Sequence, residues 1–179
     1  MRSAYLDTNV FVASYKRDDR YHEESSTVLR AIRQGKIKGK TSALTILETA
    51  AVASRTIQMR KGDDEKDVRR KAVGKAILNL SKLGLYFVHM PGDSSAPTGG
   101  SRVEMPAIFQ QALILASGVG LRSFDLVHLA AAKYSRLEDP ELGAFVTGDA
   151  DFLRRKGELA EITGTPILSP KEYVEGLGL

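Results

Sequence analysis

The sequence of 179 residues contains no cysteine and no tryptophan, and aromatic residues make up only 7% of it. Without cysteine the chain forms no disulfide bond, carries out no thiolate chemistry and offers no thiolate ligand for zinc. No apolar run approaches the roughly 20 residues that a membrane-spanning helix needs. The first residues reach charged side chains too early for a secretory signal. We therefore expect a soluble protein of the cytoplasm that does not interact with membranes.

The rest of the composition is that of an ordinary globular protein. Hydrophobic residues make up 42% and charged residues 27%, and the length suits one domain with a real core. The net charge is +4, from 26 Lys and Arg against 22 Asp and Glu. If several acids gather at one site, the remaining surface is more basic than this sum, which suits a polyanion such as RNA. Basic residues cluster at 30–40 and 60–71, although the acids inside the second cluster are typical of a solvated helix face.

Short apolar segments alternate with amphipathic segments along the whole chain. The predicted strands are residues 3–6, 37–41, 85–89, 144–147 and 165–168. The predicted helices are residues 8–15, 22–34, 45–59, 63–82, 107–117, 124–134, 150–156 and 170–176. A segment rich in Pro, Gly and Ser, residues 91–101, predicts a loop. This alternation is typical of a three-layer α/β/α fold with a mainly parallel central sheet, in which ligands bind beyond the carboxyl ends of the strands.

Four acids stand out because each of them borders an apolar segment. Asp7 and Asp149 follow predicted strands, whereas Glu48 and Asp125 lie in predicted helices. A carboxylate among core-forming residues is costly to desolvate unless its charge is offset. Four such acids indicate a shared cation, and Mg²⁺ or Mn²⁺ is held by carboxylate oxygens and water. We interpret the pattern as a metal-dependent enzyme that acts on a phosphate ester.

Each acid also has a purely structural interpretation. Asp7 would cap the helix that follows it, Asp125 would favour the start of its helix after a capping serine, and Asp149 would form a local turn. Glu48 is harder to explain in this way, because it would face the core side of its helix. Asp151, next to the fourth acid, fits a metal ligand and a surface acid equally well.

Other common catalytic patterns are missing or weak. The three histidines, His22, His89 and His128, show no metal-ligand spacing. His128 lies one helical turn after Asp125, but the pattern favours a histidine of the core or rim over one that lines the site. No Gly-rich loop of the NTPase type is present, and no second aspartate follows Asp7 two residues later, as it would in an aspartyl-phosphate phosphatase.

Taken in order, the motifs around these acids resemble those of the PIN-domain nuclease family, and within it the VapC-like toxin ribonucleases. The matching motifs are Leu6-Asp7-Thr8-Asn9, Glu48, residues 124–132 and residues 147–152. The resemblance covers nearly all of the chain. The chain is longer than compact toxins of that family, so we expect a single PIN-like domain over residues 1–179 with insertions near 60–75 and 91–106.

The resemblance implies a Mg²⁺- or Mn²⁺-dependent ribonuclease that hydrolyses RNA phosphodiester bonds and is the toxin of a toxin–antitoxin pair. Its partners would be single-stranded or structured RNA, an antitoxin protein and a second copy of the chain. The implied catalytic residues are Asp7, Glu48, Asp125 and Asp149. The implied metal ligands are Asp7, Asp125, Asp149 and Asp151. Thr8, Asn9 and Thr147 would hydrogen-bond to the carboxylates or to the scissile phosphate.

The alternative is a PIN-like RNA-binding or scaffold protein in RNA processing that does not turn over its substrate. The four acids favour the enzyme, because binding of RNA phosphate would select against negative charge. A shared ion requires carboxylate oxygens within about 5 Å of one another. Crowding of like charges also predicts a raised pKa for at least one of these acids.

A homodimer would bury the apolar face of the helix that carries Glu48. The residues of this face are Ile46, Ala50, Ala53 and Ile57. Such pairing would align the two acidic sites along a groove, which Lys36, Lys38 and Lys40 would rim for RNA.

Overall fold

The computed structural model describes residues 2–98 and 101–179 and contains a five-stranded sheet. Its strands are β1 (Ser3–Leu6), β2 (Lys38–Ser42), β3 (Tyr86–Val88), β6 (Leu142–Val146) and β7 (Ile167–Leu168). They lie in the order β3-β2-β1-β6-β7, and every neighbouring pair is parallel. The predicted parallel sheet is therefore confirmed.

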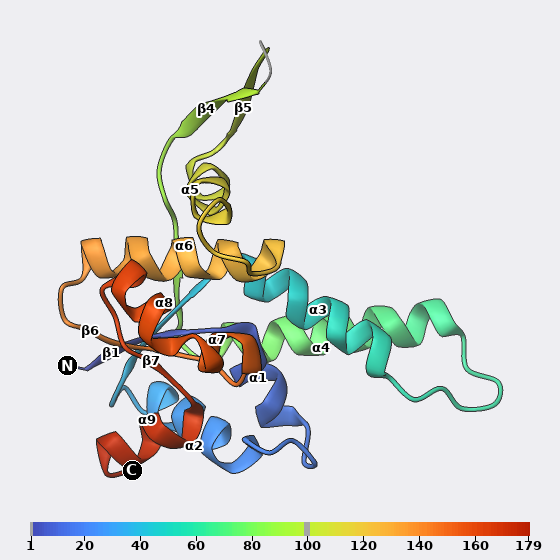
Figure 1. Cartoon of the computed structure of the whole chain (residues 1–179). Coiled ribbons are helices and arrows are strands. Elements are labelled where there is room, and N and C mark those ends of the chain that lie inside the picture. Colours follow the sequence, from blue (N-terminus) through green and yellow to red (C-terminus); the bar gives the residue numbers. More distant parts are fainter. Residues whose placement is uncertain (1, 99–100) are drawn as a thin grey trace.

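Helices cover both faces of this sheet (Figure 1). They are α1 (Thr8–Tyr15), α2 (His22–Arg33), α3 (Leu44–Thr56), α4 (Glu65–Ser81), α5 (Ala107–Ala116), α6 (Ser123–Glu138), α7 (Ala150–Arg154), α8 (Lys156–Thr163) and α9 (Pro170–Leu177). One core cluster joins the sheet to α5, α6 and α8, and the other joins it to α1, α2 and α9. The protein thus has the predicted three-layer α/β/α architecture.

Strand β1 shows how the sequence divides its side chains between these layers. Ala4 and Leu6 are buried in the cluster with α1 and α2, whereas Tyr5 is buried in the cluster with α6. Successive side chains of a strand point to opposite faces, so a fully apolar strand must be covered on both sides. Tyr5 packs edge-to-face on Phe145 at 5.1 Å, and Phe145 packs likewise on Phe152 at 5.0 Å. Burial of a large apolar side chain of this kind contributes about 1.5–3 kcal/mol.

Two predicted helix ends agree with the backbone. Gly35 follows α2 with a φ of 70°, and Gly84 follows α4 with a φ of 68°. Glycine adopts this left-handed conformation at no steric cost, so it ends a helix readily.

Other predictions were wrong. The predicted loop at 91–101 is largely extended: β4 (Asp93–Thr98) and β5 (Ser101–Pro106) form an antiparallel pair. Ser123 is the first residue of α6 and not its cap, since Arg122 occupies the cap position. The predicted helix at 150–156 ends at Arg154, and a separate helix, α8, follows it. Pairing between strands and helix packing decide these points, and local composition does not report either of them.

Strand order places a natural binding crevice beside β1. The chain runs outward from β1 to β2 and β3, and it returns to the other side of β1 with β6 and β7. In such sheets ligands bind beyond the carboxyl ends of the strands where the order reverses. Asp7 directly follows β1, and Asp149 lies three residues beyond the end of β6.

No helix within residues 2–98 and 101–179 has the length and apolarity that crossing a bilayer would require.

Candidate active site

Asp7 lies at the centre of a hydrogen-bond cluster at the carboxyl edge of the sheet. Its backbone N–H donates to Val146 O at 3.0 Å, which fixes its position between β1 and β6. Its Oδ2 accepts from the Thr147 hydroxyl at 2.7 Å and from the Asn9 amide. Asp7 occupies the cap position of α1, but its side chain makes no capping hydrogen bond. The carboxylate is therefore held by other side chains and does not serve as the helix cap.

The same network extends to Asp149. The Asn9 amide donates to Thr147 Oγ1 at 3.0 Å, and Asn9 Oδ1 accepts from the Gly148 N–H at 2.7 Å. Asp149 N–H donates to Thr147 Oγ1 at 3.0 Å. The Asp149 carboxylate also caps α7, because its Oδ1 accepts from the backbone N–H of Asp151 at 2.7 Å. Asp149 therefore has a structural role as a helix cap, and this role does not exclude a catalytic one.

Glu48 is joined to the cluster through a buried histidine. His128 Nε2 lies 2.9 Å from Glu48 Oε2 and 3.7 Å from Asp7 Oδ1. On the other side of the ring, Nδ1 lies 2.9 Å from the Tyr5 hydroxyl. The Thr8 hydroxyl donates to the same oxygen of Glu48. His128 is only 2% exposed, and its imidazole bridges α3, α6 and β1 away from water, whereas the Glu48 side chain is 23% exposed.

The charges of these groups influence one another. Burial and the charges of Asp7 and Asp149 raise the pKa of Asp125 to about 6. Burial also raises the pKa of Asp7, although His128 and Thr147 oppose that shift. A raised pKa among the four acids was expected and is confirmed. Burial is the main cause of both shifts, and for Asp125 the like charges of Asp7 and Asp149 add to it.

The pKa values of His128 and Glu48 shift in the direction that favours their charged forms. Burial opposes the charge of His128, but its hydrogen bond to Glu48 and the charges of Asp7 and Glu48 outweigh burial and raise its pKa. Burial likewise opposes the charge of Glu48, but hydrogen bonds from His128 and Thr8 lower its pKa overall. The pair is thus stabilised as imidazolium and carboxylate.

The other predicted residues lie around this cluster. Asp125 is in the first turn of α6, where the helix dipole favours a carboxylate. Asp151 forms an ion pair with Arg154 and sits on α7. Thr8, Asn9 and Thr147 all hydrogen-bond to one of the acids. The structure thus brings the four acids and the three polar residues to one edge of the sheet.

His128 and Tyr5 are the site residues that the sequence interpretation missed. His128 is buried, as expected of a core histidine, but it also contacts two of the four acids. The available signal was its spacing: it lies three residues after Asp125, so both side chains share one face of α6.

The predicted rim of lysines is wrong. Lys36 precedes β2, Lys38 is its first residue and Lys40 its middle one, and β2 pairs in parallel with β1. They therefore lie toward the amino edge of the sheet, away from Asp7. Lys40 Nζ pairs with Asp139 Oδ2 at 2.9 Å, beyond the far end of α6 from Asp125.

The apolar face predicted for a dimer is half-buried in the single chain. Its residues are Ile46, Ala50, Ala53 and Ile57, and α4 packs along the same helix, α3. Whether the chain pairs through this face stays a prediction. Large apolar side chains are exposed elsewhere, on α3, α5 and α6. They are Leu47, Phe109, Leu113, Ile114, Phe124 and Leu137.

The donor set fits a hard divalent cation in its chemistry. Aspartate and glutamate oxygens are the ligands that Mg²⁺ and Mn²⁺ prefer, and the raised pKa of Asp125 reports negative charge that a cation would balance. The arrangement is not a closed ligand shell: in the described part of the chain, no three His, Cys, Asp or Glu side chains are placed so that they could hold a metal ion together. The expected approach of three carboxylates is therefore absent there.

Comparison with known families gives one match. Residues 4–83 match the model of the PIN domain family, somewhat less than half of the chain. A search of curated proteins finds no match. The matched region runs from β1 to the end of α4 and contains Asp7 and Glu48, whereas Asp125 and Asp149 lie outside it. The match supports a relation of this region to the PIN domain family, whose members are generally nucleases.

Proposed function

We propose that this protein is a metal-dependent ribonuclease whose catalytic residues are Asp7, Glu48, Asp125 and Asp149. One observation carries the proposal: burial, and after it the nearby charges of Asp7 and Asp149, raise the pKa of Asp125 to about 6. Acids from three separate parts of the chain therefore crowd at one edge of a parallel sheet, where ligands bind. Such crowding costs stability unless a cation balances it.

Asp7, Asp125 and Asp149 would hold Mg²⁺ or Mn²⁺, with Asp151 as an outer ligand. The ion would supply an activated water and would stabilise negative charge on the phosphate oxygens. Glu48 would orient the attacking water as a base, and its lowered pKa keeps it ionised for that purpose.

The neighbouring polar groups would position these acids. Asn9 and Thr147 hold Oδ2 of Asp7, whereas Oδ1, which lies 3.7 Å from His128 Nε2, would bind the ligand. His128 and Thr8 share one oxygen of Glu48 and fix its direction. Mutation of such supporting partners generally costs ten- to a hundredfold in metal affinity or activity.

The finer assignment is also part of this proposal. The chain would be a VapC-like toxin of the cytoplasm, a single PIN-like domain over residues 1–179 with insertions near 60–75 and 91–106. Its partners would be single-stranded or structured RNA, an antitoxin protein and a second copy of itself. Sedimentation equilibrium at micromolar concentration tests the dimer: a single 19.5 kDa species would contradict it.

Cleavage of labelled RNA tests the central claim. We expect cleavage by the purified chain with Mg²⁺ or Mn²⁺, none with EDTA, and recovery when the metal is returned. Asp7→Asn should be inactive, whereas Asp18→Asn, which changes an exposed aspartate, should retain full activity. RNA that binds but stays intact under all these conditions would favour the non-catalytic RNA-binding alternative.

A further inference from the structure

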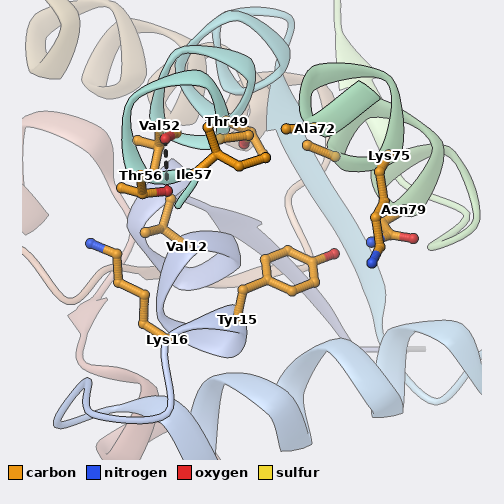
Figure 2. A pocket seen from close by; sticks show the side chains of 12 residues that line it. Val12, Tyr15, Lys16, Thr49, Val52, Thr56, Ile57, Ala72, Lys75 and Asn79 are labelled. Carbon is orange, nitrogen blue, oxygen red and sulfur yellow. Dashed lines mark hydrogen bonds between the residues drawn. The ribbon is translucent and has the colours of Figure 1, made fainter. Parts of the chain in front are cut away.

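A pocket of about 310 Å³ lies between α1, α3 and α4, outside the acid cluster (Figure 2). Its walls are mostly apolar, with Val12 from α1, Val52 and Ala53 from α3, and Ala72 and Ala76 from α4. The four acids do not line it. A cavity of this size holds a small flat molecule or part of a larger one.

The pocket begins one helical turn from the candidate active site. Thr8 of α1 and Glu48 of α3 are hydrogen-bonded to each other in that site. Val12 and Val52 each lie four residues further along the same two helices, which is about 6 Å. The two helices therefore lead directly from the acids into the pocket, and a chain bound at one would reach the other.

One hydroxyl in the pocket lacks a partner. Thr49, next to Glu48 in sequence, lines the pocket and is only 3% exposed. Its Oγ1 is fully buried and has no hydrogen-bond partner among the residues that the structure describes. A buried polar group without a partner costs roughly 1–3 kcal/mol, so this state of the Thr49 hydroxyl is unfavourable. A ligand with a polar edge would remove that cost once a small side-chain shift opens the hydroxyl to the pocket.

The rim of the pocket carries the aromatic ring of Tyr15 and the side chains of two lysines. The Tyr15 side chain is 50% exposed, and Figure 2 shows its ring reaching across the pocket with the hydroxyl toward Asn79. Lys16 and Lys75 lie on opposite sides of the opening in the same view. Within the described residues neither lysine forms an ion pair, in contrast to Lys71 on the same helix, which pairs with Asp67.

We infer that this pocket binds one nucleobase of a single-stranded RNA whose scissile phosphate lies at the acid cluster. The inference rests on the proposed function and adds a base-reading subsite to it. A nucleobase has two apolar faces and a polar edge, which match the apolar walls and the hydroxyl of Thr49. Phosphates on either side of that base would meet Lys16 and Lys75. An apolar peptide side chain would use neither the hydroxyl nor two opposed cations.

A binding cycle tests the pocket separately from catalysis. The probe is a fluorescent RNA heptamer in which one nucleotide at a time is abasic, bound to protein that carries Asp7→Asn so that the RNA stays intact. We expect one abasic position to weaken binding about tenfold, since a stacked base contributes to affinity on that scale. Ala76→Phe, which fills the pocket, should reduce that penalty to less than about twofold. Ala116→Phe, on an exposed part of α5, should leave it unchanged.

The result that would overturn the inference is an abasic penalty of the same size in both variants, or none at any position. A pocket that binds another protein instead of RNA would give such an unchanged penalty. If the unmodified chain cleaves RNA while the abasic penalty is the same in both variants, only the pocket assignment fails. If the chain neither binds nor cleaves RNA, the proposed function fails and the pocket assignment fails with it.

Conservative variants test the pocket even if Ala76→Phe does not fold. Thr49→Val should weaken heptamer binding at least threefold while it leaves the melting temperature unchanged or higher, because the unpartnered hydroxyl is removed. Thr165→Val removes another buried hydroxyl without a partner among the described residues, far from the pocket, and should not change binding.

The lysines at the rim give a second test. Lys75→Ala should weaken binding and reduce its salt dependence, whereas Lys82→Ala, at the exposed residue that caps α4, should not. Unchanged binding by Thr49→Val and Lys75→Ala would refute the pocket.

Discussion

Charged side chains are arranged differently at the two edges of the central sheet. At the amino edge, two lysines of β2 have a partner: Lys40 pairs with Asp139, and Lys38 lies over the ring of Tyr86 at 4.5 Å. At the carboxyl edge, negative groups gather around a single imidazole, and burial together with the charges of Asp7 and Asp149 raises the pKa of Asp125 to about 6. Opposite charges in contact stabilise a fold, whereas like charges in contact oppose it.

Under the proposed function, this difference would separate structural charge from functional charge. Residues selected only for stability would pair, as Lys40 and Asp139 do at the amino edge. Groups with strongly shifted pKa values near a binding crevice are candidates for chemistry. Substitutions at the two edges should therefore have opposite effects on activity and on stability.

The largest effect is expected from Asp7→Asn. It should lower metal-dependent RNA cleavage by at least about a thousandfold, since loss of a central charge-stabilising group costs on that order. The free energy of unfolding should stay the same or rise, because repulsion is relieved. Asp139→Asn, the matched change at the amino edge, should lower stability and retain cleavage. Equal loss of activity in both variants would erase the distinction between the edges.

Local signals in the sequence sufficed for most of the architecture. Apolar periodicity located the strands and helices, and glycines such as Gly35 and Gly84 located helix ends. The parallel-sheet rule then brought Asp7 and Asp149 to one edge, although they are 142 positions apart in the sequence.

What the sequence could not predict depends on three-dimensional register. Whether His128 contacts the acids depends on how α6 lies over the sheet, and helical spacing alone leaves core and site as alternatives. The β4–β5 pairing joins two segments that are neighbours in sequence, but their composition, rich in Pro, Gly and Ser, resembles that of a loop. The lysine rim failed because Lys36, Lys38 and Lys40 precede the end of β2, and parallel strands start at the opposite edge from the acids.

The second prediction concerns the imidazole at the carboxyl edge. His128→Gln should lower the rate of cleavage by about a hundredfold at saturating RNA and leave RNA affinity almost unchanged, since His128 acts through Glu48 and Asp7. Single-turnover rates and binding titrations separate the two quantities. His89→Gln changes an exposed histidine and serves as the control. A loss of RNA affinity without a loss of rate would contradict the positioning role.

The third prediction measures the ion pair at the amino edge. Lys40→Met should lower the free energy of unfolding on the order of 2 kcal/mol, because it leaves Asp139 without its partner in a largely buried position. The double variant with Asp139→Asn should recover part of this loss. Urea unfolding provides the measurement. Cleavage by both variants should match the unmodified chain, and a large loss of activity would mean that the two edges are coupled.

The smallest effect is a pH dependence of stability caused by Asp125. Its pKa is about 6 in the folded protein, above the ordinary value of 3.8. The folded state therefore binds more protons than the unfolded state between pH 4 and pH 6, and its stability falls as the pH rises through this window. Asp125→Asn removes the effect, so it should match the unmodified chain near pH 4 and be more stable above pH 6. Partial exposure of the carboxyl screens the charges, and we expect a difference below about 1.5 kcal/mol. Urea unfolding in EDTA at pH 4, 5, 6 and 7.5 measures it. A difference that does not change with pH would show that Asp125 carries no excess proton, and the contrast between the two edges would lose its electrostatic basis.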